Sequence, residues 1–158
     1  MDFAKISLGP DEGIFEFFLL IDRGTSRVIY LEGSRGYTAE TALEAVARLL
    51  RQQGMPTRLR FNRDPRLWGS WPRDSYPSAL VCFLRCLGIK DVICPPHRPD
   101  LKPLVERTIQ TMKYEWLARH SPRTVADALE LLTPFVRDYN RERPQPGTRL
   151  PEPEKLSE

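Results

Sequence analysis

Residues 14–31 read IFEFFLLIDRGTSRVIYL, and this stretch decides the fold. The run 14–21 is rich in aromatic and β-branched residues, which is typical of a buried strand. Residues 22–25 (DRGT) supply turn chemistry, and the run 27–31 then predicts a second strand, so the stretch predicts an antiparallel hairpin. Upstream, residues 2–8 (DFAKISL) alternate loosely and end at Gly9-Pro10, which predicts a first strand before the hairpin.

Helical and strand patterns alternate after the hairpin. Thr38 as N-cap and Gly54 as a C-terminal stop bound a helix, and residues 57–61 (TRLRF) predict a strand. Residues 78–87 predict a helix and residues 91–94 (DVIC) a short buried strand. Two helices follow, one over 100–119 and one that begins at Thr124 and is expected to break near Thr133, because Pro134 lies inside its apolar pattern.

This order of elements predicts an α/β fold. Three antiparallel strands should be followed by two parallel ones in one mixed five-stranded sheet, with helices on both faces. A chain of 158 residues with 41% hydrophobic and 28% charged residues can bury a core, which argues against general disorder. We expect one domain over residues 1–143 and a proline-rich tail over 144–158.

Charge and cysteine content limit the classes of partner. No apolar run approaches the length of a membrane span, and the first residues do not resemble a secretory signal, so no membrane partner is expected. Three cysteines argue for a reducing cytoplasm, and Cys82 and Cys86 are expected to be buried as small apolar side chains. The net charge of +3 is weak evidence for nucleic-acid binding, and the arginines clustered over residues 58–73 fit either a solvated loop or a DNA contact.

Five segments together resemble the catalytic core of DDE transposases and retroviral-type integrases over roughly residues 1 to 150. They are MDFAKI, LLIDRGTSR, LRFNRDPR, CPPHRPDLKPLVERTIQTMKYE and FVRDYNRERPQ, the last with Gln145 where the family has histidine. The resemblance implies a ribonuclease-H-like fold and metal-dependent nicking and transfer of DNA strands. It also implies transposon-end and target DNA as partners, a homo-oligomer, and a bacterial cytoplasm or nucleoid as the location.

The resemblance maps three metal ligands onto Asp2, Asn62 and Glu106. Such a site holds two Mg²⁺ or Mn²⁺ ions about 3.5–4 Å apart, and these hard cations prefer carboxylate oxygens. Asn62 departs from the family because a neutral amide replaces the second carboxylate. Asp64, two residues on, is a candidate replacement, so the proposed metal ligands are Asp2, Asp64 and Glu106, in a site expected to be impaired.

The same resemblance assigns contacts with DNA phosphates. Lys113 and Gln110 follow Glu106 at helical spacing, and Lys113 could equally be a solvated side chain. The full set of predicted DNA-contacting residues is Lys113, Arg107, Arg98, Gln110 and Arg63.

Two other functions stay open. One is a non-catalytic DNA-binding or oligomerising remnant of a transposase, and the other is a stand-alone ribonuclease-H-like nuclease, which the YNRERP run and the Glu106 segment disfavour. Asp2 is the second residue, so its strand is expected to lack the N-terminal half that a complete core would have.

Overall fold

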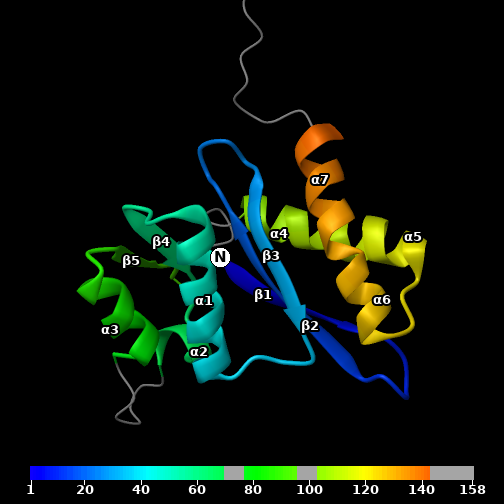
Figure 1. The fold of residues 1–158 in the computed structure, drawn as a ribbon, viewed down its shortest axis with the longest axis horizontal. Coiled ribbons are helices and arrows are strands. Elements are labelled where there is room, and N and C mark those ends of the chain that lie inside the picture. The colour runs from blue at the N-terminus through cyan, green and yellow to red at the C-terminus, as the bar shows by residue number, and fades with distance from the viewer. Residues whose placement is uncertain (70–76, 96–102, 143–158) are drawn as a thin grey trace, which may run out of the picture.

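The computed structural model describes residues 1–69, 77–95 and 103–142 (Figure 1). Its strands are β1 (Asp2–Ser7), β2 (Ile14–Ile21), β3 (Val28–Ser34), β4 (Arg58–Phe61) and β5 (Lys90–Ile93). Its helices are α1 (Ala39–Gln53), α2 (Pro65–Trp68), α3 (Ala79–Cys86), α4 (Pro103–Gln110), the π-helix η2 (Thr111–Leu117), α5 (Ala118–His120), α6 (Val125–Glu130) and α7 (Leu132–Glu142). No helix in these segments is long and apolar enough to cross a membrane.

The predicted hairpin is confirmed as part of a three-stranded antiparallel sheet. β2 pairs with β1 on one side and with β3 on the other, so it is the central strand. All of its residues are buried except Ile14, because the sheet is covered on both faces. Gly33 of β3 is needed for this packing, since a Cβ atom there would lie 2.1 Å from Cζ of Phe15.

The other two strands, β4 and β5, form a parallel ladder beside β1. The backbone nitrogen of Met1 donates to the carbonyl of Arg60 over 2.6 Å, which places the start of β1 alongside β4. The strands therefore follow the order β3-β2-β1-β4-β5 across the fold. The expected mixed sheet is present as a three-stranded and a two-stranded ladder that meet at Met1.

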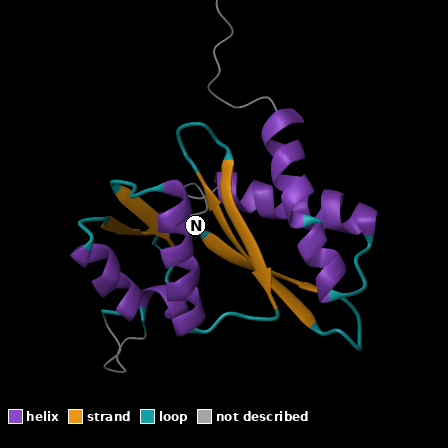
Figure 2. Cartoon of the chain, in the orientation of Figure 1, coloured by secondary structure: helices purple, strands orange, loops and turns teal. Residues whose placement is uncertain are grey.

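Helices cover both faces of this arrangement, as the sequence predicts (Figure 2). One core cluster packs α1 and α3 against one face and includes Phe18, Leu49 and Leu84. The second cluster packs the helices after residue 103 against the opposite face and includes Phe17 and Phe135. Both clusters hold large side chains with no exposed area, so each face of the sheet has its own core.

The helical region after residue 103 differs from the single helix expected over 100–119. Its middle is the π-helix η2, which rotates the following side chains relative to a regular α-helix. The last helix breaks at Leu131, between α6 and α7, three residues before Pro134. The predicted break is therefore confirmed, and its cause is the ring of Pro134, which cannot follow a regular turn.

The prediction that Cys82 and Cys86 are buried is wrong. Cys82 and Cys86 are exposed, whereas Cys94 is buried. The two exposed cysteines share one face of α3, but α3 buries the opposite face, which carries Leu80 and Leu84. The four-residue spacing of Cys82 and Cys86 places them on one face of α3, but it does not decide which face of that helix packs against the core.

Candidate active site

Asp2 and Asn62 meet at the junction of β1 and β4. Asp2 opens β1, and Asn62 follows the last residue of β4, so two side chains that touch lie 60 positions apart in the sequence. Nδ2 of Asn62 donates a hydrogen bond to Oδ1 of Asp2 over 2.9 Å, and the backbone N–H of Phe3 donates to the same oxygen over 3.0 Å. The structure thus brings together the first two of the three predicted ligand positions.

The amide of Asn62 faces Asp2 as a donor. Its oxygen Oδ1 is turned the other way and accepts the backbone N–H of Asp64 over 3.2 Å. A metal ion would need an oxygen at the place where Asn62 presents its NH₂ group, because an amide nitrogen has no free lone pair for a cation. The second ligand position therefore holds a hydrogen-bond donor, the NH₂ group of Asn62, which bonds directly to the carboxylate of Asp2.

Asp64, the candidate replacement, is held by Arg66. It caps the short helix α2 and accepts from the backbone nitrogen of Arg66 over 3.0 Å. Its carboxylate also receives Nε of Arg66 at 2.9 Å and Nη2 at 2.6 Å. Partial burial would raise the pKa of Asp64, but the hydrogen bonds from Arg66 outweigh it and hold that pKa below its ordinary value. Asp64 is thus a carboxylate whose charge is already neutralised.

Arg66 also binds Glu16 and so connects Asp64 to the buried core. Nη1 of Arg66 lies 2.7 Å from Oε1 of Glu16, which is only 1% exposed in the middle of β2. Oε2 of Glu16 accepts the backbone N–H of Tyr37 over 2.9 Å, and the guanidinium carbon of Arg66 lies 4.2 Å from the centroid of the Phe3 ring. Sequence reasoning missed this buried ion pair, although one glutamate inside an otherwise apolar strand signals a buried cationic partner.

Glu106 and the predicted DNA contacts lie on and around the helix α4. Glu106, Arg107 and Gln110 are exposed on α4. Lys113 falls in η2, where it is half-buried beside a small cavity near the end of β1. Arg63 is exposed directly after Asn62, and Arg98 lies outside the described residues.

These side chains do not fit a centre for two divalent ions. Within residues 1–69, 77–95 and 103–142, no three His, Cys, Asp or Glu side chains form a group that could hold a metal. Asn62 presents nitrogen to Asp2, and Asp64 is paired with Arg66. Two dications need several anionic oxygens in one place, and this donor set does not supply them.

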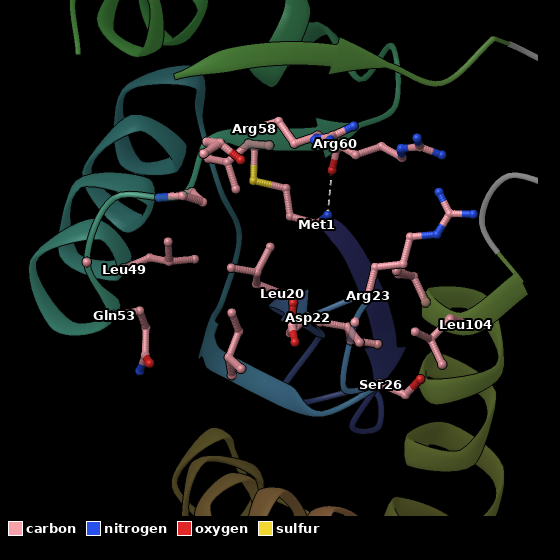
Figure 3. Close-up of a pocket in the computed structure, with 18 of the residues that line it drawn as sticks. Met1, Leu20, Asp22, Arg23, Ser26, Leu49, Gln53, Arg58, Arg60 and Leu104 are labelled. Atoms are coloured by element: carbon pink, nitrogen blue, oxygen red, sulfur yellow. Dashed lines mark hydrogen bonds between the residues drawn. The ribbon is translucent and has the colours of Figure 1, made fainter. Parts of the chain in front are cut away.

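A cleft of about 900 Å³ opens on the other side of Met1 (Figure 3). It lies between the end of β2, the start of β4, the end of α1 and the start of α4. Among the described residues that line it, four are arginines, namely Arg23, Arg58, Arg60 and Arg107. Asp22 is an acidic residue of this lining, and its pKa is lowered chiefly by a hydrogen bond from the Thr25 hydroxyl.

Comparison with known proteins gives the context for this geometry. Residues 87–148 match the family model described as the integrase core domain. The structure superposes with a TM-score of 0.66 on a chain of the simian T-cell lymphotropic virus intasome, solved in complex with PP2A regulatory subunit B56 gamma. It superposes with a TM-score of 0.64 on the catalytic core domain of BIV integrase. The fold is that of an integrase catalytic core.

The likeness to the integrase structures lies in the fold and much less in the sequence. Sequence identity is 15% to each, over 90% of this chain. The chain spans 83% of the BIV integrase core but about half, 47%, of the intasome chain. No curated protein matches the sequence significantly. The ribonuclease-H-like fold predicted from the sequence is thereby confirmed.

The integrase-core match includes the YNRERP segment, and the structure shows what its first two residues do. The hydroxyl of Tyr139 lies 2.7 Å from that of Thr108, which links α7 to α4. Asn140 donates to the carbonyl of Val28 over 2.8 Å and accepts the N–H of Val28 over 2.9 Å. Tyr139 and Asn140 therefore bind the last helix to the core.

Proposed function

We propose that this chain is the core of a DNA transposase or integrase that binds DNA but whose metal-dependent nicking and strand transfer are strongly impaired. The observation that carries the proposal is the 2.9 Å hydrogen bond from Asn62 to Asp2. It fills the second ligand position with a donor. The integrase-core fold and the family match over residues 87–148 support the DNA-directed part of the proposal.

The alternative is a competent enzyme that uses Asp64 in place of Asn62. Asp64 would then have to leave Arg66, which donates three hydrogen bonds to its carboxylate. Each hydrogen bond to a charged group contributes about 1.5–3 kcal/mol, so this rearrangement is costly. Among the described residues, it would also leave Arg66 with contacts to Glu16, Tyr37 and Phe3 alone. The impaired site is the better supported of the two.

Restoring the missing carboxylate tests the proposal. Supercoiled plasmid is incubated with Mn²⁺ and either the wild type or Asn62→Asp, and nicked product is followed on a gel. We expect nicking by the variant only, because a second carboxylate beside Asp2 creates an anionic pair for the metal. The matched control combines Asn62→Asp with Asp2→Asn. It has the same number of carboxylates at these two positions as the wild type, and it should be inactive. Equal nicking by the wild type would refute the impaired site.

DNA binding is tested separately from chemistry. Affinity for duplex DNA is measured over a range of salt concentrations, where each phosphate contact contributes about 0.9 to the slope of log affinity against log salt. Lys113→Ala should reduce the slope by about one contact, whereas Lys90→Ala, an exposed lysine on β5, serves as the control. Salt-independent or absent binding would refute the DNA-directed part of the proposal.

Assembly into a homo-oligomer belongs to the same proposal. Strand transfer joins two DNA ends, so a core of this kind acts with at least one other copy. Light scattering of the free chain and of its DNA complex measures the number of copies. A monomer in both states would contradict this part of the proposal.

A further inference from the structure

The π-helix η2 changes which side chains share a face with Glu106. α4, η2 and α5 follow one another without a break and form one helical rod (Figure 1). Within this rod the carbonyl of Lys113 accepts the backbone N–H of Ala118, five residues on, which is the hydrogen bond of a π turn. A π turn holds more residues than an α turn, so the side chains that follow it point in directions that the spacing of a regular helix does not predict.

Burial along the rod shows the effect of this rotation. In a regular α-helix Leu117, eleven residues after Glu106, would come back to within about 20° of it. Glu106 is exposed, yet Leu117 is 3% exposed and packs in the second core cluster. A regular helix would also place Lys113 on the face of Glu106, but Lys113 is half-buried beside a small cavity. The π turns have therefore rotated Leu117 into the core and Lys113 to the edge of the exposed face.

Tyr114 takes the place on the exposed face that a regular helix would give to Lys113. Glu106, Gln110 and Tyr114 follow one another at intervals of four residues, and all three are exposed. Four residues are slightly more than an α turn and fewer than a π turn, so these positions stay in one line along a rod that contains both. Tyr114 is 75% exposed, so most of its ring is open to solvent.

The surroundings of this exposed ring are polar. Among the described residues of the rod, Tyr114 is the one large hydrophobic side chain that is exposed. The other exposed residues from position 106 onward are small, polar or charged, namely Glu106, Arg107, Gln110, Glu115, Ala118, Arg119 and His120. The centre of a protein–protein interface would need further apolar side chains around the tyrosine. A single flat ring among polar groups fits a flat ligand with a polar backbone better.

We propose that Tyr114 stacks on an unpaired base of DNA bound along this face, so that the chain binds DNA with a single-stranded end more tightly than blunt duplex. The inference rests on the proposed function, because it adds a base contact beside the expected phosphate contact of Lys113. A base inside a duplex is stacked on both sides, whereas an unpaired base offers a free π-face to an aromatic ring.

The charged neighbours of Tyr114 fit a ligand with a phosphate on each side of the stacked base. Arg107 follows Glu106 and Lys113 precedes Tyr114, so the two cations lie on opposite sides of the line through Glu106 and Tyr114. Glu106 and Glu115 offset part of this positive charge. Binding at this surface should therefore depend on the ring more than on ion pairs.

Two fluorescent DNAs test the inference with the whole chain, a blunt duplex and the same duplex with a short single-stranded overhang. Fluorescence anisotropy of the wild type should show tighter binding of the overhang DNA. Tyr114→Ala should weaken binding of the overhang DNA by about 5- to 150-fold, the range of one base–aromatic stack, and leave binding of the blunt duplex unchanged. The salt slope should also stay unchanged, because stacking releases no counterions. Leu129→Ala removes another exposed apolar side chain, on α6, and should bind both DNAs as the wild type does.

Removal of the bases gives an answer that does not depend on any variant. Abasic sites throughout the overhang should weaken binding by the wild type to the level of Tyr114→Ala and should not affect that variant further. Tyr114→Trp, which keeps an aromatic ring, should retain the preference for the overhang DNA.

The possible failures of the two proposals can be told apart. If the wild type binds DNA with a clear salt dependence but Tyr114→Ala binds the overhang DNA equally tightly, the stacking inference is wrong and the proposed DNA function stands. That result would leave another protein as the partner of Tyr114. If the wild type binds neither DNA, the proposed function fails and the stacking inference fails with it.

Discussion

Replacing Asn62 with aspartate should destabilise the protein when metal is absent. Asn62 donates to Asp2 over 2.9 Å, and an ionised aspartate cannot donate. Losing a hydrogen bond to a charged group costs about 1.5–3 kcal/mol, and two adjacent carboxylates add repulsion that partial exposure screens. We expect a total loss of about 2–4 kcal/mol, which for a domain of this size lowers the melting temperature by roughly 5–15 °C.

Divalent metal should reverse part of this loss in the variant only. A cation that binds the folded state adds about 2.7 kcal/mol when its free concentration is 100 times its dissociation constant. Melting is followed by circular dichroism in EDTA and in Mn²⁺. Asn62→Ala is the matched control, because it loses the hydrogen bond without adding a charge and should show a smaller loss and no response to metal. If Mn²⁺ raised the wild-type melting temperature as much as that of Asn62→Asp, the reasoning about Asn62 would be wrong.

Three further predictions concern stability. Arg66→Met should lower the free energy of unfolding, measured with urea, by about 2–4 kcal/mol, because Glu16 stays buried and, among the described residues, keeps only Lys5 as a cationic partner. A loss below about 1 kcal/mol would contradict the role of this ion pair. The pKa of Asp64 is lower in the folded state than in the unfolded state. The ion pair with Arg66 therefore stabilises the fold above the unfolded pKa, and this stabilisation is lost as the pH falls through the folded pKa. Acid unfolding curves should show a smaller decline in the free energy of unfolding below about pH 5 for Arg66→Met than for the wild type. Asn140→Ala should cost about 1–3 kcal/mol because it leaves two backbone groups of β3 without their partner, and an unchanged urea midpoint would refute that estimate.

Local sequence signals predicted the regular elements well. Thr38 and Gly54 bound α1 as expected, with a capping box between Thr38 and Thr41. The apolar run of β2 and the turn after it produced the hairpin. The resemblance to integrase cores also predicted that residues 2 and 62 would meet, since it mapped two ligands of one metal site onto them.

Features that depend on distant partners were not predictable in the same way. The ion pair of Glu16 with Arg66 joins residues 50 positions apart. The lone glutamate in an apolar strand signals a buried cation, but it does not identify Arg66 as that cation. The helix α2 has local signals, an Asp64 cap and Pro65 in its first turn, but it is too short for a periodic apolar pattern. The sequence gives no signal for the π-helix η2, which is linked to the α6–α7 junction by a hydrogen bond from Nε1 of Trp116 to the carbonyl of Leu131.

The two hydrogen bonds between the side chain of Asn140 and the backbone of Val28 also affect how copies of this protein can associate. β3 is the outermost strand of its sheet, and an outer strand with free backbone groups is a template for the strand of another molecule. The carboxamide of Asn140 mimics a peptide group and occupies the N–H and C=O of Val28 together. Edge-to-edge growth into fibrous aggregates is therefore blocked at this end of β3, and an ordered assembly of copies has to be built through other surfaces.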